Sequence, residues 1–220
     1  MPSDETLVTC RDAALTFGRG SQAVVAVHGA NLKIRAGDRL AVVGPSGSGK
    51  SSLLHLLAGL EQPTSGEVIR PEPLGTYDIG LVFQGDSLIP ALNVLENAAL
   101  PLVLAGRTEP EAQEAARAAL GLVGAADLVD RLPEEISGGQ AQRAAAARVL
   151  AQGPRLILAD EPTGRLDHAT ATRLLDALLT AADRTGAALV VTTHDPAVAA
   201  RLTVQHSMRE GRLLESEKTS

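Results

Sequence analysis

The stretch "DRLAVVGPSGSGKSSLLHLLAGL", residues 38–60, decides the fold of this chain. Its first part predicts a buried strand that runs into a glycine-rich turn, and its last part carries leucines at helical spacing. Between them, "GPSGSGKS" at 44–51 matches the pattern G-x-x-x-x-G-K-[ST], which joins a strand to a helix. The stretch therefore predicts a phosphate-binding loop in a core of alternating strands and helices.

The glycines of this loop let successive backbone N–H groups surround an anion, and the dipole of the following helix adds to the attraction. Lys50 is placed to reach the β- and γ-phosphates of a nucleotide, and the Ser51 hydroxyl is placed to ligate Mg²⁺. The alternative is a glycine-rich turn with a surface lysine, which the flanking strand and helix disfavour. The residues assigned to nucleotide binding here are Gly44, Pro45, Ser46, Gly47, Ser48, Gly49, Lys50, Ser51 and Ser52.

Polar side chains end three further predicted strands. "LILADEP" at 156–162 delivers Asp160, which suits the outer shell of Mg²⁺, and Glu161, which can polarise an attacking water. Gln84 follows "GLVF" and can bind Mg²⁺ or water, and His194 in "VVTTHDP" fits a γ-phosphate contact. Each has a structural alternative: a helix cap for the acidic pair, an internal hydrogen bond for the glutamine, a packing role for the histidine. Because ligands bind where parallel strands end, we expect these side chains beside the phosphate loop.

The remaining segments predict an α/β protein with a mainly parallel sheet and right-handed crossovers. Residues 7–17 and 23–34 read as strands of an N-terminal antiparallel β subdomain. Helical patterns alone occupy the middle of the chain, where "TEPE" at 108–111 offers a capping box. We expect a single domain, with a core of residues 1–84 and 141–220 and an inserted α-helical subdomain of residues 85–140. A hairpin ("SMREGRLLES") and a disordered tail ("EKTS", 217–220) are expected at the end.

Composition excludes several classes of protein. Hydrophobic residues make up 45% and charged residues 21%, as in a folded globular domain. The net charge is -6 and no basic stripe is present, so we expect no nucleic-acid partner. Cys10 is the single cysteine, which favours a reducing compartment. No apolar run approaches the roughly 18 residues of a membrane span, and the polar, acidic start is unlike a secretory signal, so we expect a cytoplasmic protein.

"ISGGQAQR" at 136–143 adds adjacent glycines before an alanine-rich helix, a place where something approaches the backbone closely. In chain order, "GPSGSGKS", "VFQ", "ISGGQ", "LADEP", "GRLD" and "TTHD" resemble the motifs of the ATP-binding subunit of an ABC transporter, and they cover almost the whole chain. The resemblance implies a P-loop NTPase core of the RecA-like type, with ATP and Mg²⁺ as ligands and ATP hydrolysis as the activity. "ISGGQ" is similar to the family signature "LSGGQ", with Ile136 as the difference.

The same resemblance implies a head-to-tail dimer, either a homodimer or a pseudo-dimer with a related ATPase subunit. Ser137, Gly138, Gly139 and Gln140 would then cover the γ-phosphate of ATP held by the partner, and a glycine-bearing helix N-terminus suits an anion. Asp167 matches the loop that contacts the opposite subunit, although Arg165 stands where the family often has Asn. Phe17 falls where the family places an aromatic ring against adenine; a core phenylalanine is the alternative.

Within the family, "FQGDSLIPALNVLENAALPLVLAG" is similar to the segment of lipoprotein-releasing and macrolide-exporting ATPases. The likeness implies an integral membrane permease subunit that docks on residues 85–100, and a peripheral position on the inner face of the cell membrane. A regulatory ATPase of the cell-division type, which acts on a membrane partner without transport, is the alternative. A soluble family member of translation or DNA repair is disfavoured, since such chains usually carry two cassettes or long coiled coils.

Overall fold

The protein is described by a computed structural model that places residues 5–71, 74–85 and 87–215. The predicted tail at 217–220 lies outside the described residues. The strands are β1 (Thr6–Phe17), β2 (Val24–Arg35), β3 (Arg39–Val43), β4 (Ser65–Ile69), β5 (Ile79–Val82), β6 (Leu156–Asp160), β7 (Ala188–Thr193), β8 (Val204–Arg209) and β9 (Arg212–Glu215). The helices are α1 (Lys50–Ala58), α2 (Val94–Leu104), α3 (Glu109–Leu122), α4 (Gly138–Gln152), α5 (His168–Thr185) and α6 (Pro196–Ala199).

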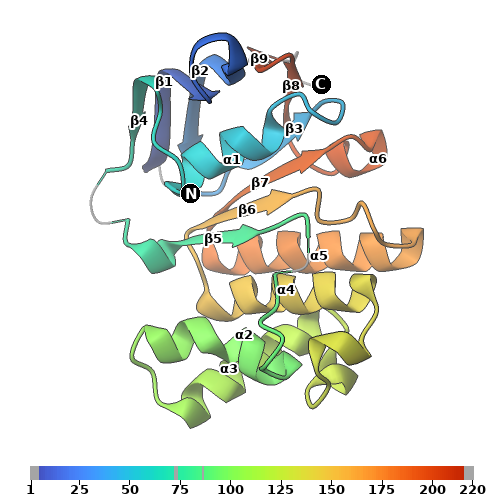
Figure 1. The fold of residues 1–220 in the computed structure, drawn as a ribbon. Helices are drawn as coiled ribbons and strands as arrows, with labels where there is room; N and C mark the ends of the chain where they lie inside the picture. Colours follow the sequence, from blue (N-terminus) through green and yellow to red (C-terminus); the bar gives the residue numbers. More distant parts are fainter. Residues whose placement is uncertain (1–4, 72–73, 86, 216–220) are drawn as a thin grey trace.

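The strands form two sheets (Figure 1). The larger has the order β5-β6-β7-β3-β8-β9, in which all neighbours are parallel except the β8–β9 hairpin. The smaller is antiparallel, with the order β2-β1-β4. These sheets confirm the predicted α/β class, the mainly parallel core, the N-terminal antiparallel subdomain and the C-terminal hairpin.

Side chains alternate between the two faces of the parallel sheet, so each central strand contributes to two cores. On β6, Leu156 and Leu158 pack with α1 and the antiparallel sheet, whereas Ile157 and Ala159 pack with the helices on the opposite face. In Figure 1, α1 and the small sheet lie on one side of the parallel sheet, and α4 and α5 lie on the other. The central strands β6 and β7 are buried on both faces, which explains their nearly continuous apolar sequences.

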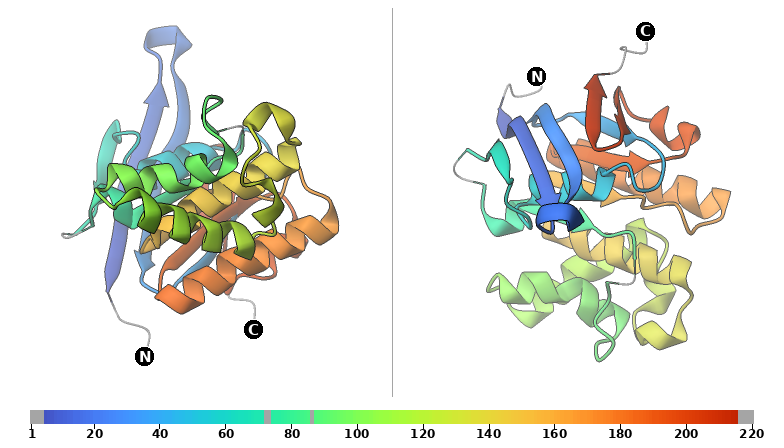
Figure 2. Two further views of the ribbon diagram at one scale, coloured as in Figure 1. Left: turned by 90° about the horizontal axis from the view of Figure 1, so that it is seen from below. Right: turned by 45° about the horizontal axis from the view of Figure 1, so that its top comes forward.

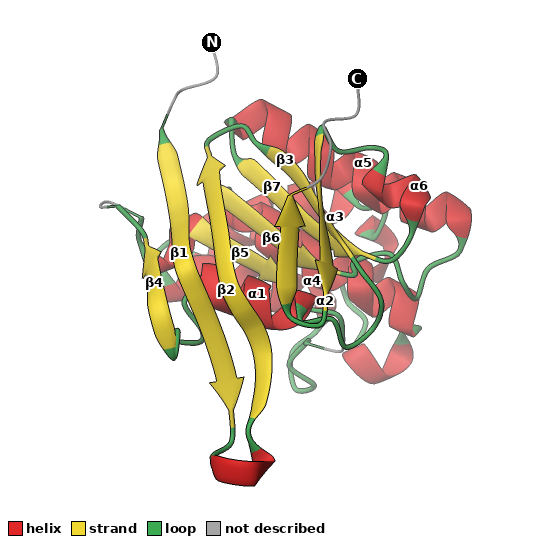
Figure 3. Ribbon diagram, turned by 90° about the horizontal axis from the view of Figure 1, so that it is seen from above, coloured by secondary structure: helices red, strands yellow, loops and turns green. Residues whose placement is uncertain are grey.

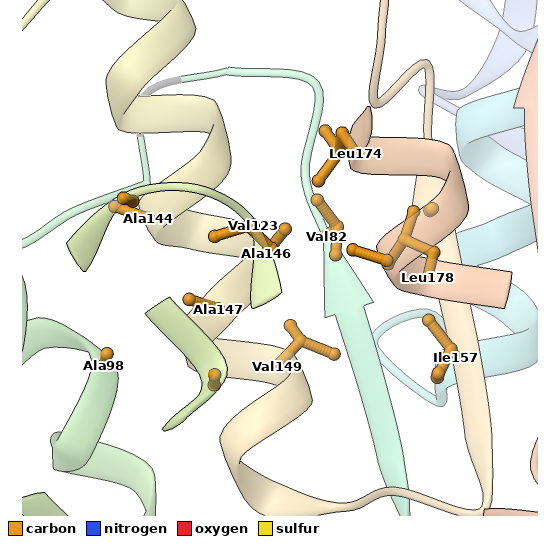
Figure 4. Close-up of a cluster of buried hydrophobic side chains, with 14 of the residues drawn as sticks. Val82, Ala98, Val123, Ala144, Ala146, Ala147, Val149, Ile157, Leu174 and Leu178 are labelled. Atoms are coloured by element: carbon orange, nitrogen blue, oxygen red, sulfur yellow. The ribbon is translucent and has the colours of Figure 1, made fainter. Parts of the chain in front are cut away.

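The helices between β5 and α4 do not have a separate core. Residues of α2 and α3 belong to the same buried cluster as residues of α4, α5 and the sheet. Figure 4 shows Ala98 on one side of α4, and Val82, Ile157, Leu174 and Leu178 on the other. Helix α4 therefore lies between the sheet and helices α2 and α3, and its small alanines allow close packing on both sides. The division at residues 84/85 and 140/141 stays a prediction.

The β1–β2 hairpin extends away from the parallel sheet (Figure 2, left view). Its tip is a short 3₁₀ turn, Gly20–Gln22, which closes the two long strands (Figure 3). On the strand that returns from this tip, His28 donates its backbone N–H to Gly211 at 2.8 Å, and Gly211 donates to the carbonyl of Ser48 at 2.9 Å. The β8–β9 turn thus ties the antiparallel sheet to the phosphate loop.

Among the residues that the structure describes, no helix is both long and apolar enough to cross a membrane.

Candidate functional site

The predicted convergence of strand ends is present. Strands β5, β6, β7 and β3 are neighbours and parallel, so their carboxyl ends lie along one edge of the sheet. The following groups lie at this edge: the phosphate loop after β3, Gln84 after β5, Asp160 and Glu161 at the end of β6, and His194 after β7. The sheet therefore brings together groups that lie more than a hundred residues apart in the chain.

The phosphate loop is held by close backbone packing. Gly49 has a φ of 100° and precedes α1, and a Cβ on it would clash with the carbonyl oxygen of Ala26. A Cβ on Gly44 would clash with the carbonyl oxygen of Met208 in β8. Helix α1 begins without a side-chain cap, so its first-turn N–H groups remain available to an anion.

Lys50 is the buried cation of the loop, with 5% of its side chain exposed. Its ammonium donates to the carbonyls of Gly44 at 2.9 Å and Pro45 at 3.0 Å. It also forms an ion pair with Oε1 of Glu161 at 3.1 Å. These contacts fix the ammonium at the mouth of the loop, next to the acidic end of β6.

Glu161 is the centre of the polar cluster. Its Oε1 contacts Lys50, and its Oε2 lies 3.3 Å from Nε2 of Gln84 and 3.0 Å from Nδ1 of His194. Gln84 and His194 therefore each contact the carboxylate of Glu161, which brings the three predicted catalytic side chains together. The side chain of His194 is 61% exposed, so it approaches the cluster from the solvent side.

Asp160 is buried at the end of β6, with 6% of the residue exposed. The hydroxyl of Thr192 on β7 donates to its Oδ1 at 2.6 Å. Thr192 was not singled out from the sequence, because a threonine in an apolar strand gives no signal of a polar contact. The pairing of Asp160 with Thr192 in the sheet register brings it there.

A cleft of 410 Å³, here called the phosphate-loop cleft, opens beside these groups. Its lining includes Lys50, Ser51, Gln84 and Glu161 on one side, and Val24, Val25, Ala26, His28, Glu210 and Gly211 from the antiparallel sheet and the β8–β9 turn on the other. Phe17 does not line this cleft; it pairs with Val24 across the sheet and is 43% exposed, so it is not a core residue. Of the loop, Ser46, Gly47, Gly49 and Ser52 also line the cleft, whereas Gly44, Pro45 and Ser48 do not.

The residues expected to hold Mg²⁺ fit that ion in chemistry. Ser51 and Gln84 offer oxygen atoms to the cleft, and Asp160 adds a carboxylate at the adjoining strand end. Mg²⁺ prefers oxygen ligands and usually binds through one or two carboxylates together with substrate phosphates and water. A sparse set of three side chains therefore matches a magnesium nucleotide better than a metal held by protein alone. In the described part of the chain, no cluster of three or more acidic, histidine or cysteine side chains forms a metal site.

A second hollow lies at the N-terminus of α4. Ser137 caps this helix: its Oγ accepts from the N–H of Gln140 at 3.3 Å, and Oε1 of Gln140 accepts from the N–H of Ser137 at 2.7 Å. The hollow measures 420 Å³ and is called the signature hollow here. It is lined by Ser137, Gly138, Gly139, Gln140, Arg143, Arg165, Leu166, Asp167 and Thr170. None of these residues lines the phosphate-loop cleft.

Asp167 caps the N-terminus of α5 and also lines the signature hollow. Its carboxylate accepts from the hydroxyl of Thr170 at 2.6 Å and from the N–H of Thr170 at 3.0 Å. These two hydrogen bonds, the hydroxyl one first, lower the pKa of Asp167 below its ordinary value. Asp167 thus ends a loop that brings Arg165 to the same hollow as Ser137.

Helix α4 also holds the segment around Gln84. Gln142 is buried and donates from Nε2 to the carbonyl of Phe83 at 3.1 Å. Arg148 donates to the carbonyl of Ser87 at 2.7 Å and to its hydroxyl at 2.9 Å. The sequence did not reveal either contact, because polar residues on a predicted helix are usually solvent-exposed. The helix that carries the signature residues is therefore bonded to both sides of Gln84.

The fold and the site together define a phosphate-loop NTPase core. The family model described as "ABC transporter" matches residues 27–164. The chain is 37% identical to the lipoprotein-releasing system ATP-binding protein LolD of Shewanella denitrificans, over 98% of each chain. It is 39% identical to the protein of the same name from Chromohalobacter salexigens, over 97% of this chain and 95% of the relative.

Solved structures agree with these relatives. The dimeric, post-hydrolysis structure of the ATP-binding cassette MJ0796 bound to ADP and Pi superposes with a TM-score of 0.89 at 34% identity, over 96% of this chain and 98% of that one. A dimeric structure of MJ0796 described as a bacterial ABC transporter cassette gives the same TM-score at 35% identity over the same shares. The chain therefore belongs to the ABC transporter family, as an ATP-binding domain similar to LolD.

Proposed function

We propose that the chain binds and hydrolyses ATP as a dimer, and that hydrolysis drives a membrane partner that releases or exports a lipid-linked or amphipathic substrate. The polar cluster around Glu161 carries this proposal. The Glu161 carboxylate, at the end of β6, contacts Lys50, Gln84 and His194, which come from the ends of three neighbouring strands. The lipoprotein-releasing relatives support the type of partner, and the dimeric cassettes support the assembly.

In this proposal, the phosphates of ATP bind at the N-terminus of α1 and along the loop 44–52. Lys50 neutralises charge on the β- and γ-phosphates. As its ammonium turns toward the phosphates, its ion pair with Glu161 weakens, and Oε1 of Glu161 becomes able to accept a proton from the attacking water. Gln84 and His194 hold Oε2 of the same carboxylate, so that the free oxygen faces the γ-phosphate.

Ser51, Gln84 and Asp160 would hold Mg²⁺ at the phosphates. When bound, the ion offsets phosphate charge and stabilises the transferring group. Phe17, at the end of β1, is proposed to meet the adenine ring together with Val24, since both side chains are exposed and Phe17 pairs with Val24, which lines the cleft.

The separation of the two proposed anion sites supports a dimer. The signature hollow is open, is lined by Arg143 and Arg165, and shares no residue with the phosphate-loop cleft. A single chain therefore presents the two halves of an ATP site at different places on its surface. Two copies arranged head to tail would bring Ser137, Gly138 and Gly139 of each to the γ-phosphate held by the other. Asp167 would lie at the same boundary.

The membrane partner is proposed to dock on residues 85–100 and the adjoining part of α2. A groove of 210 Å³ there is lined by apolar side chains of α2, by Leu92 and by Glu96, Glu109 and Gln113. Ile89 is exposed beside it. An apolar groove with a polar rim suits a short helix of another protein. We accordingly propose a cytoplasmic protein, peripheral on the inner face of the membrane, with no nucleic-acid partner.

Affinity purification from native membranes tests the partner. An integral membrane protein should co-purify with the wild-type chain and stimulate or respond to ATP hydrolysis. Val103→Asp, in the groove, should lose the partner, whereas Leu122→Asp should keep it, because Leu122 is also 43% exposed but lies outside the groove. A partner that binds without moving any substrate indicates the regulatory alternative. Purified protein without ATPase activity, or equal effects of the two variants, contradicts the proposal.

A further inference from the structure

Thr192 is a polar residue in the apolar interior of the parallel sheet. It has 0% exposure, and its neighbours along β7 include Val190 and Val191. In the sheet register it lies directly opposite Asp160 of β6. A buried hydroxyl costs free energy unless it is hydrogen-bonded, so its partners decide whether it is a passive or a functional group.

The hydroxyl of Thr192 connects the two acidic residues. It donates to Oδ1 of Asp160 at 2.6 Å and accepts from the backbone N–H of Glu161 at 3.0 Å. A threonine hydroxyl has one proton to donate and lone pairs to accept with, so both bonds form at once. One oxygen atom on β7 thereby orients the carboxylate of Asp160 and the backbone of Glu161.

The backbone of Glu161 needs such support. Its φ is 42°, in the left-handed region that residues with a Cβ seldom adopt. A residue keeps this conformation only where its surroundings hold it. Two bonds from Glu161 N–H, to the carbonyl of Thr192 at 3.1 Å and to its hydroxyl at 3.0 Å, attach this turn to β7. The turn aims the Glu161 side chain at Lys50, Gln84 and His194.

We propose that the Thr192 hydroxyl is a positioning group for ATP hydrolysis, which aligns Asp160 toward the metal position and Glu161 toward the attacking water. The proposal rests on the proposed function. Without the hydroxyl, Oδ1 of Asp160 loses its donor at a site where only 6% of the residue is exposed, so water replaces the bond poorly. The N–H of Glu161 then keeps only its bond to the carbonyl of Thr192, so the Glu161 side chain is freer to turn away from the attacking water.

Three variants test this role. Thr192→Val preserves shape and strand preference but removes the hydroxyl, and Thr192→Ser preserves the hydroxyl. Thr203→Val is the control, because the Thr203 hydroxyl donates to the backbone carbonyl of Arg39, at the opposite end of β3 from the phosphate loop. For each, kcat and KM for ATP are measured, together with ATP affinity in Mg²⁺ and in EDTA, and thermal unfolding.

The expected kcat of Thr192→Val is about tenfold lower than wild type, because a misaligned catalytic group forfeits much of its rate contribution. Thr192→Ser and Thr203→Val should stay within about twofold, and ATP affinity in EDTA should be unchanged. In Mg²⁺, the gain in ATP affinity seen for wild type should shrink in Thr192→Val and persist in Thr192→Ser. If Val and Ser behave alike at position 192, whether both active or both impaired, the positioning role is overturned.

Thr192→Ala covers the case in which Thr192→Val is too unstable to purify: the role then predicts the same kcat loss for Ala relative to Ser, and equal kcat values would overturn it. A wild-type protein without ATPase activity contradicts the proposed function itself. Wild-type ATP affinity that does not respond to Mg²⁺ contradicts the magnesium assignment, and the kcat comparison then decides the role of Thr192.

Discussion

Two helix N-termini in this molecule are proposed to bind an anion, and they differ in what surrounds them. At α1, Lys50 is buried and already engaged by Glu161 and by two loop carbonyls. At α4, the signature residues are exposed or half-buried, and two arginines line the same hollow. The N-terminus of α1 is therefore surrounded by polar groups of its own chain, whereas the N-terminus of α4 is open to solvent.

Their glycines show the same difference. Gly49 is required by the close approach of Ala26, which leaves no room for a Cβ. Gly138 has open space around the position of a Cβ. Nothing in the described part of the chain therefore requires a glycine at position 138, and the requirement is expected to come from a second molecule. The comparison teaches that packing within the chain shapes the loop before α1, whereas the N-terminus of α4 is left open, as expected of the half-site proposed there.

Removal of the Lys50 ammonium should have the largest effect. Lys50→Ala deprives the phosphates of their buried cation and leaves Glu161 without its ion pair, so ATP binding should weaken and turnover should fall at least about a thousandfold. Lys33→Ala, at an exposed position on β2, is the control and should retain wild-type turnover. Measurement of nucleotide affinity and ATPase rate decides the matter; wild-type affinity in Lys50→Ala contradicts the phosphate-loop assignment.

Glu161→Gln should rank second, with turnover reduced on the order of a thousandfold. The amide preserves the shape of the side chain but no longer accepts a proton, so ATP should bind and remain intact. The variant should accumulate as an ATP-dependent dimer in size-exclusion chromatography with light scattering. Glu67→Gln, which alters a surface ion pair with Arg11, should behave as wild type. Near wild-type hydrolysis by Glu161→Gln excludes this residue as the base.

Gly138→Asp tests the open half-site, and we expect a loss of turnover of about a hundredfold. The added carboxylate repels the γ-phosphate of the partner's ATP, yet it should not harm the fold, because an acidic residue in the first turn of α4 suits the helix dipole. The matched control is Gly121→Asp, a helical glycine of α3 that also has open space around it. Gly121→Asp should lower stability slightly and keep activity. Equal activity of both variants breaks the comparison.

The smallest expected effect concerns the cap of α5. The Thr170 hydroxyl and N–H depress the pKa of Asp167, so the charged form stabilises the fold above the ordinary pKa of 3.8. That contribution is lost as the pH falls through the lower pKa of the folded state. Asp167→Asn keeps an acceptor oxygen without the charge, so denaturant unfolding should show it slightly less stable than wild type at neutral pH. A difference that persists unchanged in acid contradicts the assignment.

Much of the fold was predictable because local and global signals agree. The loop 44–51, the apolar strands and the capping box at 108–111 each predicted an element that the structure contains. Parallel strand order then forces Gln84, Glu161 and His194 to one edge, so the cluster followed from the positions of these residues at strand ends. The start of α4 differs from the prediction: the adjacent glycines were placed before the helix, whereas α4 begins at Gly138 because Ser137 is its cap.

The rest depended on contacts between segments that are distant in the chain. Thr192, Gln142 and Arg148 look like ordinary strand and helix residues, and only the packed structure shows their bonds to Asp160, Phe83 and Ser87. Val24 and Val25 line the cleft because β2 lies against the phosphate loop at Ala26, a contact that their sequence does not encode locally.

Cross-linking between chains tests the central claim, that the signature hollow of one copy completes the phosphate-loop cleft of another. Ser46 is exposed in the loop and Gln140 lies in the hollow, so one preparation carries Ser46→Cys and a second carries Gln140→Cys, both with Glu161→Gln. Native Cys10 stays and serves as the control, because burial raises its pKa to about 11 and keeps it an unreactive thiol. The account predicts a covalent dimer only when the two preparations are mixed and ATP is present. Cross-links that form equally without ATP, or equally within either preparation alone, contradict it.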